Sequence, residues 1–503
     1  MTGRLLMVQG TASHVGKSIL VTALCRIFKQ DGYAVAPFKA QNMSLNSFVT
    51  PDGGEIGRAQ AVQAEAAGIA PSVEMNPILL KPEAHSRSQV VVLGKVRASV
   101  AAGEYYMMKA ELFPVVTEAL EKLRSRYDIV VIEGAGGAAE VNFARTEIVN
   151  MGFARHFQAP VLLVGDIERG GVFASLLGTL WLLEPDDARL VKALIINKFR
   201  GDIKLLEPGV KFLEEKSGIP VAGVIPYFDH IHIAQEDSVA LEQSRPRQKG
   251  LMDVAVIRVP HISNFDDFDP LAQESDVRVR FVKSVADLNS PDLIILPGSK
   301  TTAADLNWLR ESGLADRIIE LFQQGAFVIG ICGGYQMLGE YIDDPEQVES
   351  KVKRQRGLGL LPVTTTFLPE KETHQVEGIV ITDEGLLSRA GDMHFTGYEI
   401  HMGKTELSGG KPAFCIRTRS GKHCDSSDGC IEGTAMGTYI HGLFHNQGLR
   451  RAILNHIAQG KGFTLSFSDS KDQGGEYDKL AELVRNSLDM SLIRRIAGLS
   501  KGE

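Results

Sequence analysis

The fold of this chain is decided by residues Val8–Ser18, which read VQGTASHVGKS and continue the apolar run 4–10. They match the phosphate-binding pattern G-x-x-x-x-G-K-[ST] except that Thr11 stands at the first glycine position and Gly10 comes one residue too early. A strand before this loop and a helix after it would turn backbone N–H groups and the positive end of a helix dipole towards phosphate. The predicted nucleotide site comprises Gly10, Thr11, Val15, Gly16, Lys17 and Ser18.

A metal ion is the next expected component of this site. The Ser18 hydroxyl is placed to bind Mg²⁺, and the apolar run DIVVIEGAG carries Glu133 to the same edge of the predicted sheet. A buried carboxylate there needs a partner such as Mg²⁺, whereas a solvated strand-end glutamate needs none. Asp52 and Glu55, in TPDGGEIG, are further candidate ligands, although such residues are also common in turns.

Apolar runs alternate with helix-length segments around the loop, which is typical of a doubly wound, mostly parallel α/β sheet. The predicted strands are residues 4–10, 34–40, 128–136, 160–166, 193–199 and 221–226. Ligands of such sheets bind at the carboxyl ends of the strands, so two strand-end residues join the nucleotide site. Lys39 would neutralise a phosphate or carboxylate, and the Asn197 amide would either pair with a purine edge or close a turn.

A second series of strands is predicted after a polar break, over residues 252–260, 277–282, 291–299 and 326–332. We therefore expect a P-loop domain over 1–233, a linker over 234–250 and a second α/β domain over 251–450. A helical carboxyl-terminal tail over 451–503 is expected to pack on the second domain.

Composition restricts the functional classes. The 503 residues carry a formal net charge of -8 without a long basic run, so we expect no nucleic-acid partner. Neither a signal peptide nor a membrane span is evident, which favours a cytoplasmic protein with no membrane partner. The 5 cysteines are scattered, so single thiols deserve more interest than disulfides or zinc. The oligomeric state is left open, with a homo-oligomer as one option.

One of these thiols lies in a pattern typical of a nucleophile. The run FVIGICGGYQML predicts a strand that turns into a helix at Cys332, and its G-x-C-x-G arrangement permits a strained elbow. A helix amino terminus and a nearby imidazole would favour the thiolate. His441, in GTYIHGLFHN, is the predicted general base, with His445 as the alternative. Backbone N–H groups at Gly298 and Ser299, in LPGSKTT, are predicted to bind the oxyanion.

The spacing of the first loop resembles that of the dethiobiotin synthetase family. This resemblance implies that ATP converts a carboxylate into an acyl phosphate. Partitioning ATPases are the rival within this loop class, but the additional lysine of their loop would fall at Ala12.

The second domain resembles the class I glutamine amidotransferases, which release ammonia from glutamine at a cysteine elbow. Their glutamate two residues after the histidine is replaced here by Leu443, so the third member of a triad is unidentified. Glu399, in GYEIHMG, is a candidate for orienting a ring or binding substrate.

Both domains together are similar to the cobyric acid synthase family through KAQNMSLNSFVTPDGGEIGRAQ, GDIERGGVFAS, INKFRGD, PHISNFDDFDPL and GTYIHGLF. The resemblance implies cobalamin (vitamin B12) biosynthesis and amidation of the b, d, e and g carboxylates of adenosylcobyrinic acid a,c-diamide. Each amide would consume one ATP and one glutamine, with Mg²⁺ as cofactor. Small molecules are thus the expected partners.

Four charged residues are assigned to the corrinoid under this resemblance, and a solvated surface charge is the alternative for each of the basic ones. They are Arg58, Lys81, Arg87 and Glu147. Rival functions are cobyrinic acid a,c-diamide synthase, whose relatives carry a GPDYID-like stretch where this chain has KAQNMSLNS, and a regulatory protein with an inactive glutaminase site.

Overall fold

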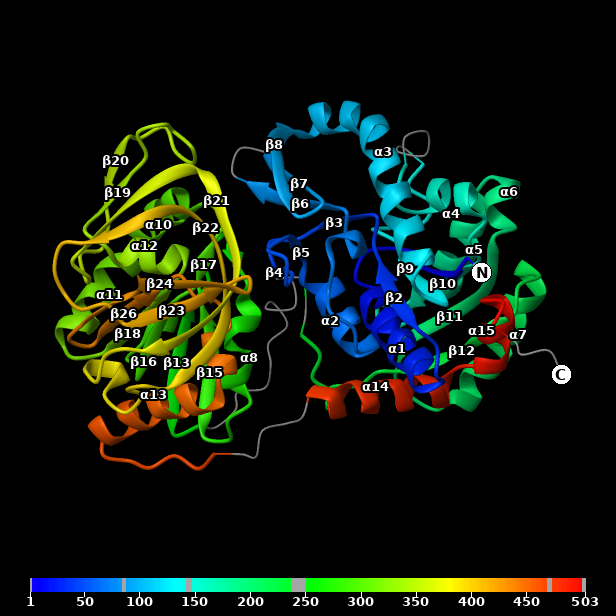
Figure 1. Cartoon of the computed structure of the whole chain (residues 1–503). Helices are drawn as coiled ribbons and strands as arrows, with labels where there is room; N and C mark the ends of the chain where they lie inside the picture. Colours follow the sequence, from blue (N-terminus) through cyan, green and yellow to red (C-terminus); the bar gives the residue numbers. More distant parts are fainter. Residues whose placement is uncertain are drawn as a thin grey trace.

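The apolar runs of the amino-terminal half pair into one parallel sheet, as predicted. The computed structural model describes residues 2–83, 87–141, 147–234, 236, 250–467 and 473–499. The 6-stranded sheet has the order β12-β11-β10-β1-β9-β2 (Figure 1). Its strands are β1 (Arg4–Gly10), β2 (Val35–Phe38), β9 (Ile129–Glu133), β10 (Val161–Asp166), β11 (Val191–Phe199) and β12 (Val221–Pro226).

Helices cover both faces of this sheet, which explains why its strands are continuously apolar. Alternate β1 residues enter different cores: Met7 packs with α3 (Ala102–Arg124), and Leu6 packs with α1 (Lys17–Gln30). The first face is also covered by α4 (Met151–Phe157), α5 (Val172–Leu182) and α7 (Ile203–Ser217). The short α6 (Pro185–Ala188) precedes β11.

A small mixed sheet, which we had not predicted, is inserted after β2. Its order is β3-β6-β7-β8, and a separate hairpin pairs β4 with β5. Together with α2 (Arg58–Ala67), these strands lie on the side of the first domain that faces the second (Figure 1). Their bounds are β3 (Gln41–Met43), β4 (Ser47–Val49), β5 (Glu55–Gly57), β6 (Ile78–Glu83), β7 (Arg87–Val92) and β8 (Lys95–Ala101).

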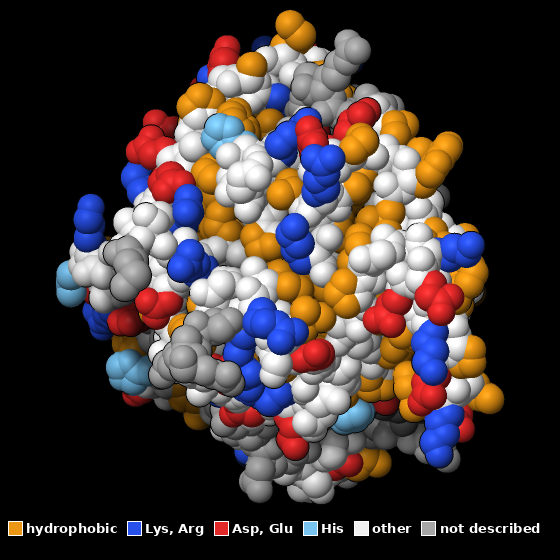
Figure 2. Space-filling model, turned by 90° about the vertical axis from the view of Figure 1, so that its right-hand side faces the viewer, with side chains coloured by type: hydrophobic (Ala, Val, Ile, Leu, Met, Phe, Trp, Pro, Cys, Tyr) orange, Lys and Arg blue, Asp and Glu red, His pale blue; other side chains and the backbone are white. Residues whose placement is uncertain are grey.

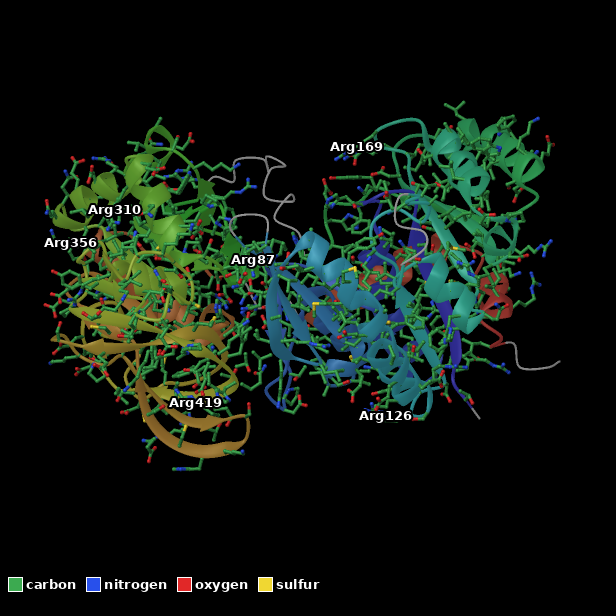
Figure 3. The ribbon with its side chains drawn as sticks, turned by 90° about the horizontal axis from the view of Figure 1, so that it is seen from above. Arg87, Arg126, Arg169, Arg310, Arg356 and Arg419 are labelled. Carbon is green, nitrogen blue, oxygen red and sulfur yellow. The ribbon has the colours of Figure 1, made fainter. Side chains whose placement is uncertain are left out.

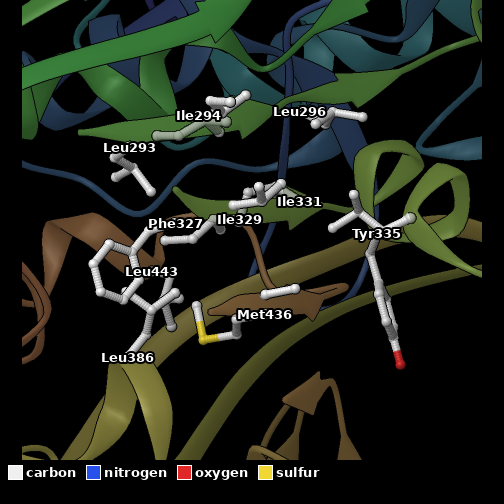
Figure 4. Close-up of a cluster of buried hydrophobic side chains, with 14 of the residues drawn as sticks. Leu293, Ile294, Leu296, Phe327, Ile329, Ile331, Tyr335, Leu386, Met436 and Leu443 are labelled. Carbon is white, nitrogen blue, oxygen red and sulfur yellow. The ribbon is translucent and has the colours of Figure 1, made fainter. Parts of the chain in front are cut away.

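The four predicted strands of the second domain also share one sheet, of order β15-β13-β16-β18-β26-β25. Branched and aromatic side chains fill its core (Figure 4), which fixes the positions of the loops at its edge. The bounds are β13 (Met252–Ile257), β15 (Val277–Val282), β16 (Leu293–Leu296), β18 (Phe327–Ile331), β25 (Cys430–Glu432) and β26 (Ala435–Thr438).

A second sheet of this domain, not predicted, is built around a long hairpin of β21 (Val363–Val380) and β22 (His394–Leu407). It also contains β19 (Tyr341–Asp343), β20 (Arg354–Arg356), β23 (Phe414–Arg419) and β24 (Lys422–Asp428). The helices of the domain include α8 (Asp269–Ala272), α10 (Thr302–Glu311), α11 (Leu314–Gln323) and α12 (Gly333–Leu338).

The carboxyl-terminal tail corrects one expectation. Only α13 (Gln447–Gly460) packs on the second domain, whereas α14 (Gln473–Ser487) and α15 (Met490–Ile496) return to the first (Figure 1). Asp478 on α14 pairs with Arg26 on α1 at 2.7 Å. The apolar face of this helix therefore completes the first core, which a reading of local sequence does not reveal. Most of the expected linker and residues 500–503 lie outside the described residues.

The face of the first domain turned away from the second carries both signs of charge with apolar side chains between them (Figure 2). Trp181 and Leu205 are among the exposed apolar residues of the first domain. In the part of the chain that the structure describes, no helix has the length and apolar character that a membrane crossing requires.

Candidate functional site

The phosphate-binding loop links β1 to α1, as predicted. Gly16 has φ +101° at the start of α1, and a methyl group there would lie 2.1 Å from Nδ2 of Asn197. That amide donates to the carbonyl of Val15 at 2.8 Å. Asn197 therefore supports the loop from β11, a contact that neither the purine nor the turn interpretation included. At Gly10, a methyl group would lie 2.5 Å from Cγ2 of Val15, so the early glycine permits the loop to close on itself.

Lys17 spans the mouth of this loop. Its ammonium donates to the carbonyls of Ala12 at 2.9 Å and Gly136 at 2.8 Å, on two different strand ends. Burial is the main reason that the pKa of Lys17 falls to about 8, partly opposed by the charge of Glu133. An anion bound here would again favour the protonated, positively charged form of Lys17. The position of this lysine therefore suits a phosphate.

Glu133 is the centre of a buried hydrogen-bond cluster. The register pairs it with Val8 across β1 and β9, which brings it beside the loop. Ser18 Oγ and Lys39 Nζ both donate to its Oε1 at 2.8 Å, and Gln63 Nε2 donates to Oε2 at 2.6 Å. Burial would raise the pKa of Glu133, but the charge of Lys39 and these donors hold it below its usual value. The carboxylate is thus ionised and pre-oriented.

The donors present suit Mg²⁺, which binds oxygen ligands and often takes only one or two carboxylates plus water and phosphate. Ser18 and Glu133 supply a hydroxyl and a carboxylate in contact with each other. Asp52 does not join them: it is exposed in the β4–β5 turn, where it accepts a hydrogen bond from Thr50. No group of three His, Cys, Asp or Glu side chains among the described residues is arranged for a metal.

Glu236 is a member of this site that sequence reasoning missed. It lies within the expected linker, yet one oxygen is 3.6 Å from Lys39 Nζ, and the other accepts a hydrogen bond from Asn42. Burial and the nearby charge of Glu133 raise the pKa of Glu236, whereas Lys39 lowers it, and the net direction is upward. Its position in a polar, strand-poor stretch offered no periodic signal.

A cavity of about 2000 Å³ opens from this cluster and extends across to the second domain. This exceeds the roughly 300–1,000 Å³ of an ordinary ligand pocket, so a nucleotide and a large second substrate can both be accommodated. Walls from the first domain include Lys17, Glu133 and Tyr105, and walls from the second include Phe265 and Asp266.

The four residues assigned to the corrinoid have different positions. Lys81 is buried, pairs with Glu55 at 2.7 Å and is not among the residues that line the cavity. Arg87 lies on the edge of the first domain facing the second (Figure 3), where it donates to Ser99, and it does not line the cavity either. These two positions contradict a direct grip on a substrate inside this cavity, because Lys81 is held within the first domain by Ser47 and Glu55, and Arg87 by Ser99.

Glu147 and Arg58 do line the cavity. The Glu147 carboxylate accepts hydrogen bonds from backbone N–H groups at the start of α4, including that of Gly152 at 2.8 Å. It thus caps a helix in this structure. Arg58 is buried and ion-paired with Asp266 at 2.8 Å.

Cys332 occupies a strained elbow at the end of β18, as predicted. Its φ of 51° and ψ of -110° lie outside the usual regions for a residue with a side chain. The conformation is held by the hydrogen bond from its backbone nitrogen to the carbonyl of Thr438 at 2.8 Å. Sγ is buried and lies 3.3 Å from the carbonyl oxygen of Ile400.

His441 lies beside Cys332 and is oriented by Asp267, a residue that sequence reasoning missed. Asp267 Oδ2 is 2.6 Å from Nδ1 of His441, and Oδ1 accepts from the backbone N–H of Gly442 at 2.9 Å. Burial alone would lower the pKa of His441, but the charge and hydrogen bond of Asp267 and the contact with Cys332 raise it to about 10. The signal in the sequence was the acidic run FDDFD, which no spacing rule linked to a histidine 174 residues later.

The predicted oxyanion loop lies against both groups. A methyl group at Gly298 would lie 3.0 Å from Cε1 of His441, and one at Gly333 would lie 2.8 Å from the backbone nitrogen of Ser299. The backbone at Gly333, directly after the nucleophile, is therefore close to the backbone N–H of Ser299 in this loop. This arrangement can stabilise an oxyanion formed at Cys332.

Two alternatives from the sequence have other positions. His445 lies in the cavity wall, where burial and the charge of Arg58 lower its pKa. Glu399 is buried and forms an ion pair with Arg419 at 2.8 Å (Arg419 in Figure 3). Its carboxylate is therefore bound to Arg419 and not to the His441 ring. That ring is instead stacked on Tyr398, with centroids 5.2 Å apart.

Comparison with protein families matches both domains. Residues 6–240 match the model of the CobQ/CobB/MinD/ParA nucleotide binding domain, and residues 253–449 match the CobB/CobQ-like glutamine amidotransferase domain.

Curated relatives extend the similarity over the whole chain. A protein named cobyric acid synthase from Dehalococcoides mccartyi strain CBDB1 is 55% identical over 496 residues, covering 98% of both chains. Its namesake from Desulfitobacterium hafniense strain DCB-2 is 50% identical, covering 99% of this chain and 98% of its own. The namesake from Sorangium cellulosum is 51% identical and covers 100% of each.

Proposed function

The chain belongs to the cobyric acid synthase family, and from this membership we propose that it amidates four carboxylates of adenosylcobyrinic acid a,c-diamide, at b, d, e and g. The family consists of ATP-dependent, glutamine-hydrolysing ligases of cobalamin biosynthesis. The observation that carries the finer proposal is the cavity that extends from the ATP loop to Phe265 and Asp266 of the second domain, so that the synthetase site opens towards the domain that supplies ammonia.

The first domain activates the carboxylate in this proposal. A carboxylate does not accept ammonia at neutral pH because oxide is a poor leaving group, and phosphorylation by ATP supplies a better one. Lys17 and the loop N–H groups hold the phosphates, and Lys39 neutralises the carboxylate or the transferred phosphoryl group. Mg²⁺, when bound to Ser18 and Glu133, would offset the charge of the phosphates.

The second domain supplies ammonia. His441 keeps Cys332 reactive, the thiolate attacks the glutamine amide, and the N–H groups near Gly333 and Ser299 stabilise the resulting oxyanion. His441 then donates a proton to the departing ammonia, and water hydrolyses the glutamyl thioester. Asp267 holds the ring in the orientation that this proton transfer requires.

Mass spectrometry of the corrinoid tests the reaction. The purified protein is incubated with ATP, Mg²⁺ and glutamine, and with either cobyrinic acid or its adenosylated a,c-diamide. We expect successive losses of about one mass unit for each carboxylate converted to amide, four in all, from the a,c-diamide. Amidation of the unamidated acid at a and c alone would instead identify an a,c-diamide synthase.

Replacement of Asp267 by asparagine tests the orienting role. We expect glutamine-dependent amidation to fall at least about tenfold, because the ring loses a charged partner that fixes its tautomer. Asp267 raises the pKa of His441 to about 10, so removing its charge lets the imidazolium deprotonate at lower pH. The alkaline limb of the glutaminase pH profile should therefore move to lower pH.

Ammonia-dependent amidation by the same variant is the control and should be nearly unchanged. An Asp276→Asn variant, altered on the same domain at a partly exposed position, is the matched substitution. An Asp267→Asn enzyme with an unchanged rate and pH profile would show that His441 works without this carboxylate.

A further inference from the structure

The glutaminase residue Asp267 belongs to a turn that the first domain holds in place. The 3₁₀ turn η5 (Phe265–Phe268) follows Asn264, which has φ +52°. Ser47 N donates to Asn264 Oδ1 at 2.9 Å, across the domain boundary. The second domain thus has its histidine-orienting carboxylate on a segment whose geometry depends on the other domain.

A second contact between η5 and the first domain is the ion pair formed by Arg58 and Asp266. Arg58 Nε lies 2.8 Å from Asp266 Oδ2, and both side chains are more than nine-tenths buried. Among the described residues, Nε of Arg58 and Oδ1 of Asp266 lack an aligned hydrogen-bond partner, so the pair is held by charge rather than by ideal geometry. Asp266 directly precedes Asp267, so moving one carboxylate moves the other.

An aromatic contact series forms a second connection between the same groups. The Arg58 guanidinium carbon lies 5.3 Å from the ring centroid of Phe48, which is 5.6 Å from that of Tyr398. Tyr398 in turn stacks on His441 at 5.2 Å and 14°. Arg58 is therefore connected to the surroundings of His441 in two ways. One runs through the carboxylate of Asp266, and the other runs through the rings of Phe48 and Tyr398.

Helix α2 connects this arginine to the ATP site. Arg58 is its first residue, and Gln63, which donates to Glu133 at 2.6 Å, lies five residues later on the same helix. At about 1.5 Å of rise per residue, the two side chains start about 7.5 Å apart along the axis. A short, buried helix of this kind moves as one body, so a displacement at Glu133 reaches Asp266.

We propose that Arg58 is a positioning residue for the glutaminase: its pairing with Asp266 holds η5 so that Asp267 orients His441, and α2 ties that pairing to the ATP site. This role rests on the proposed function of Cys332 and His441. It replaces the corrinoid-binding role expected for Arg58 from the sequence. Glutamine hydrolysis would then be fast when the first domain holds α2 in the position that pairs Arg58 with Asp266. It would be slower when α2 is displaced from that position.

Arg58→Gln in the full-length enzyme tests this role. We expect kcat for glutamine hydrolysis to fall about tenfold to a hundredfold, because a misplacement of the order of 1 Å has that effect on a proton transfer. KM for glutamine, kcat with free ammonia and KM for the corrinoid should change less than about threefold. The substitution removes no group that binds glutamine, ATP or the corrinoid in this proposal. Arg58→Lys, which keeps the charge beside Asp266, should recover part of the rate.

Arg155→Gln is the matched control, since Arg155 is an exposed arginine of the same domain, 3.3 Å from Asp187 and remote from η5. Thermal unfolding of each variant verifies folding, and Asp266→Asn removes the same charge pair from the other side if Arg58→Gln does not fold. A raised KM for the corrinoid with free ammonia would overturn the proposal and make Arg58 a substrate ligand. Unchanged glutamine hydrolysis would also overturn it. Failure of the function itself would appear separately, as glutamine-dependent amidation that survives Cys332→Ala.

Discussion

A Cys332→Ala enzyme is expected to lose glutamine-dependent amidation by at least about 10³-fold while it still amidates with free ammonia, because only the source of ammonia is removed. The elbow places Sγ beside His441 and the N–H groups near Ser299, and a methyl group in its place cannot attack the amide. The alanine fits the same backbone, and the fold should survive.

The measurement follows amide formation on the corrinoid with glutamine and, separately, with ammonium chloride at a pH where free ammonia is present. Cys415→Ala, in β23 of the same domain, is the matched control and should behave as the parent enzyme. Loss of both activities in Cys332→Ala would mean that this cysteine supports the structure or belongs to the synthetase site. Retention of both would exclude it as the nucleophile.

The second large effect is expected for Lys17→Ala, which should lower amidation with either nitrogen donor by about 10²–10³-fold. The ammonium is buried between the loop carbonyls of Ala12 and Gly136, at the point where outer phosphates would lie. Its removal takes away the cation that would balance charge developing during phosphoryl transfer. Hydrolysis of glutamine by itself should be affected much less, because Cys332 and His441 are in the other domain.

Both amidation reactions and the binding of a fluorescent ATP analogue are measured on the same preparation. Lys29→Ala, at the exposed end of α1, controls for loss of a lysine from that helix. Ammonia-dependent amidation at the parental rate in Lys17→Ala would refute the role of this lysine in phosphate binding. Normal nucleotide affinity with a lowered rate would assign it to transition-state charge alone.

Elements with strong local patterns were predictable. The six strands of the first sheet and four of the second lie in mostly apolar runs, apart from β15, in which Val and Arg alternate, and the loop Gly10–Ser18 carries its own glycine and lysine pattern. The long hairpin of β21 and β22 was missed because much of it is polar and exposed, so its alternation is weak. Helix α14 was recognised as helical, but its amphipathic face does not state which core it covers.

The residues of the candidate sites also fall into a group that was predictable from the sequence and a group that was not. Cys332, His441, Lys17 and Ser18 are each marked by residues next to them in the chain, so the sequence by itself was enough to predict the two chemistries and the residues expected at their centres. Asp267, Glu236 and the pairing of Arg58 with Asp266 join groups separated by long stretches of chain, and only the tertiary structure decided them. The physical reason is that a carboxylate acts over a few ångströms of space, whereas a motif records neighbours along the chain.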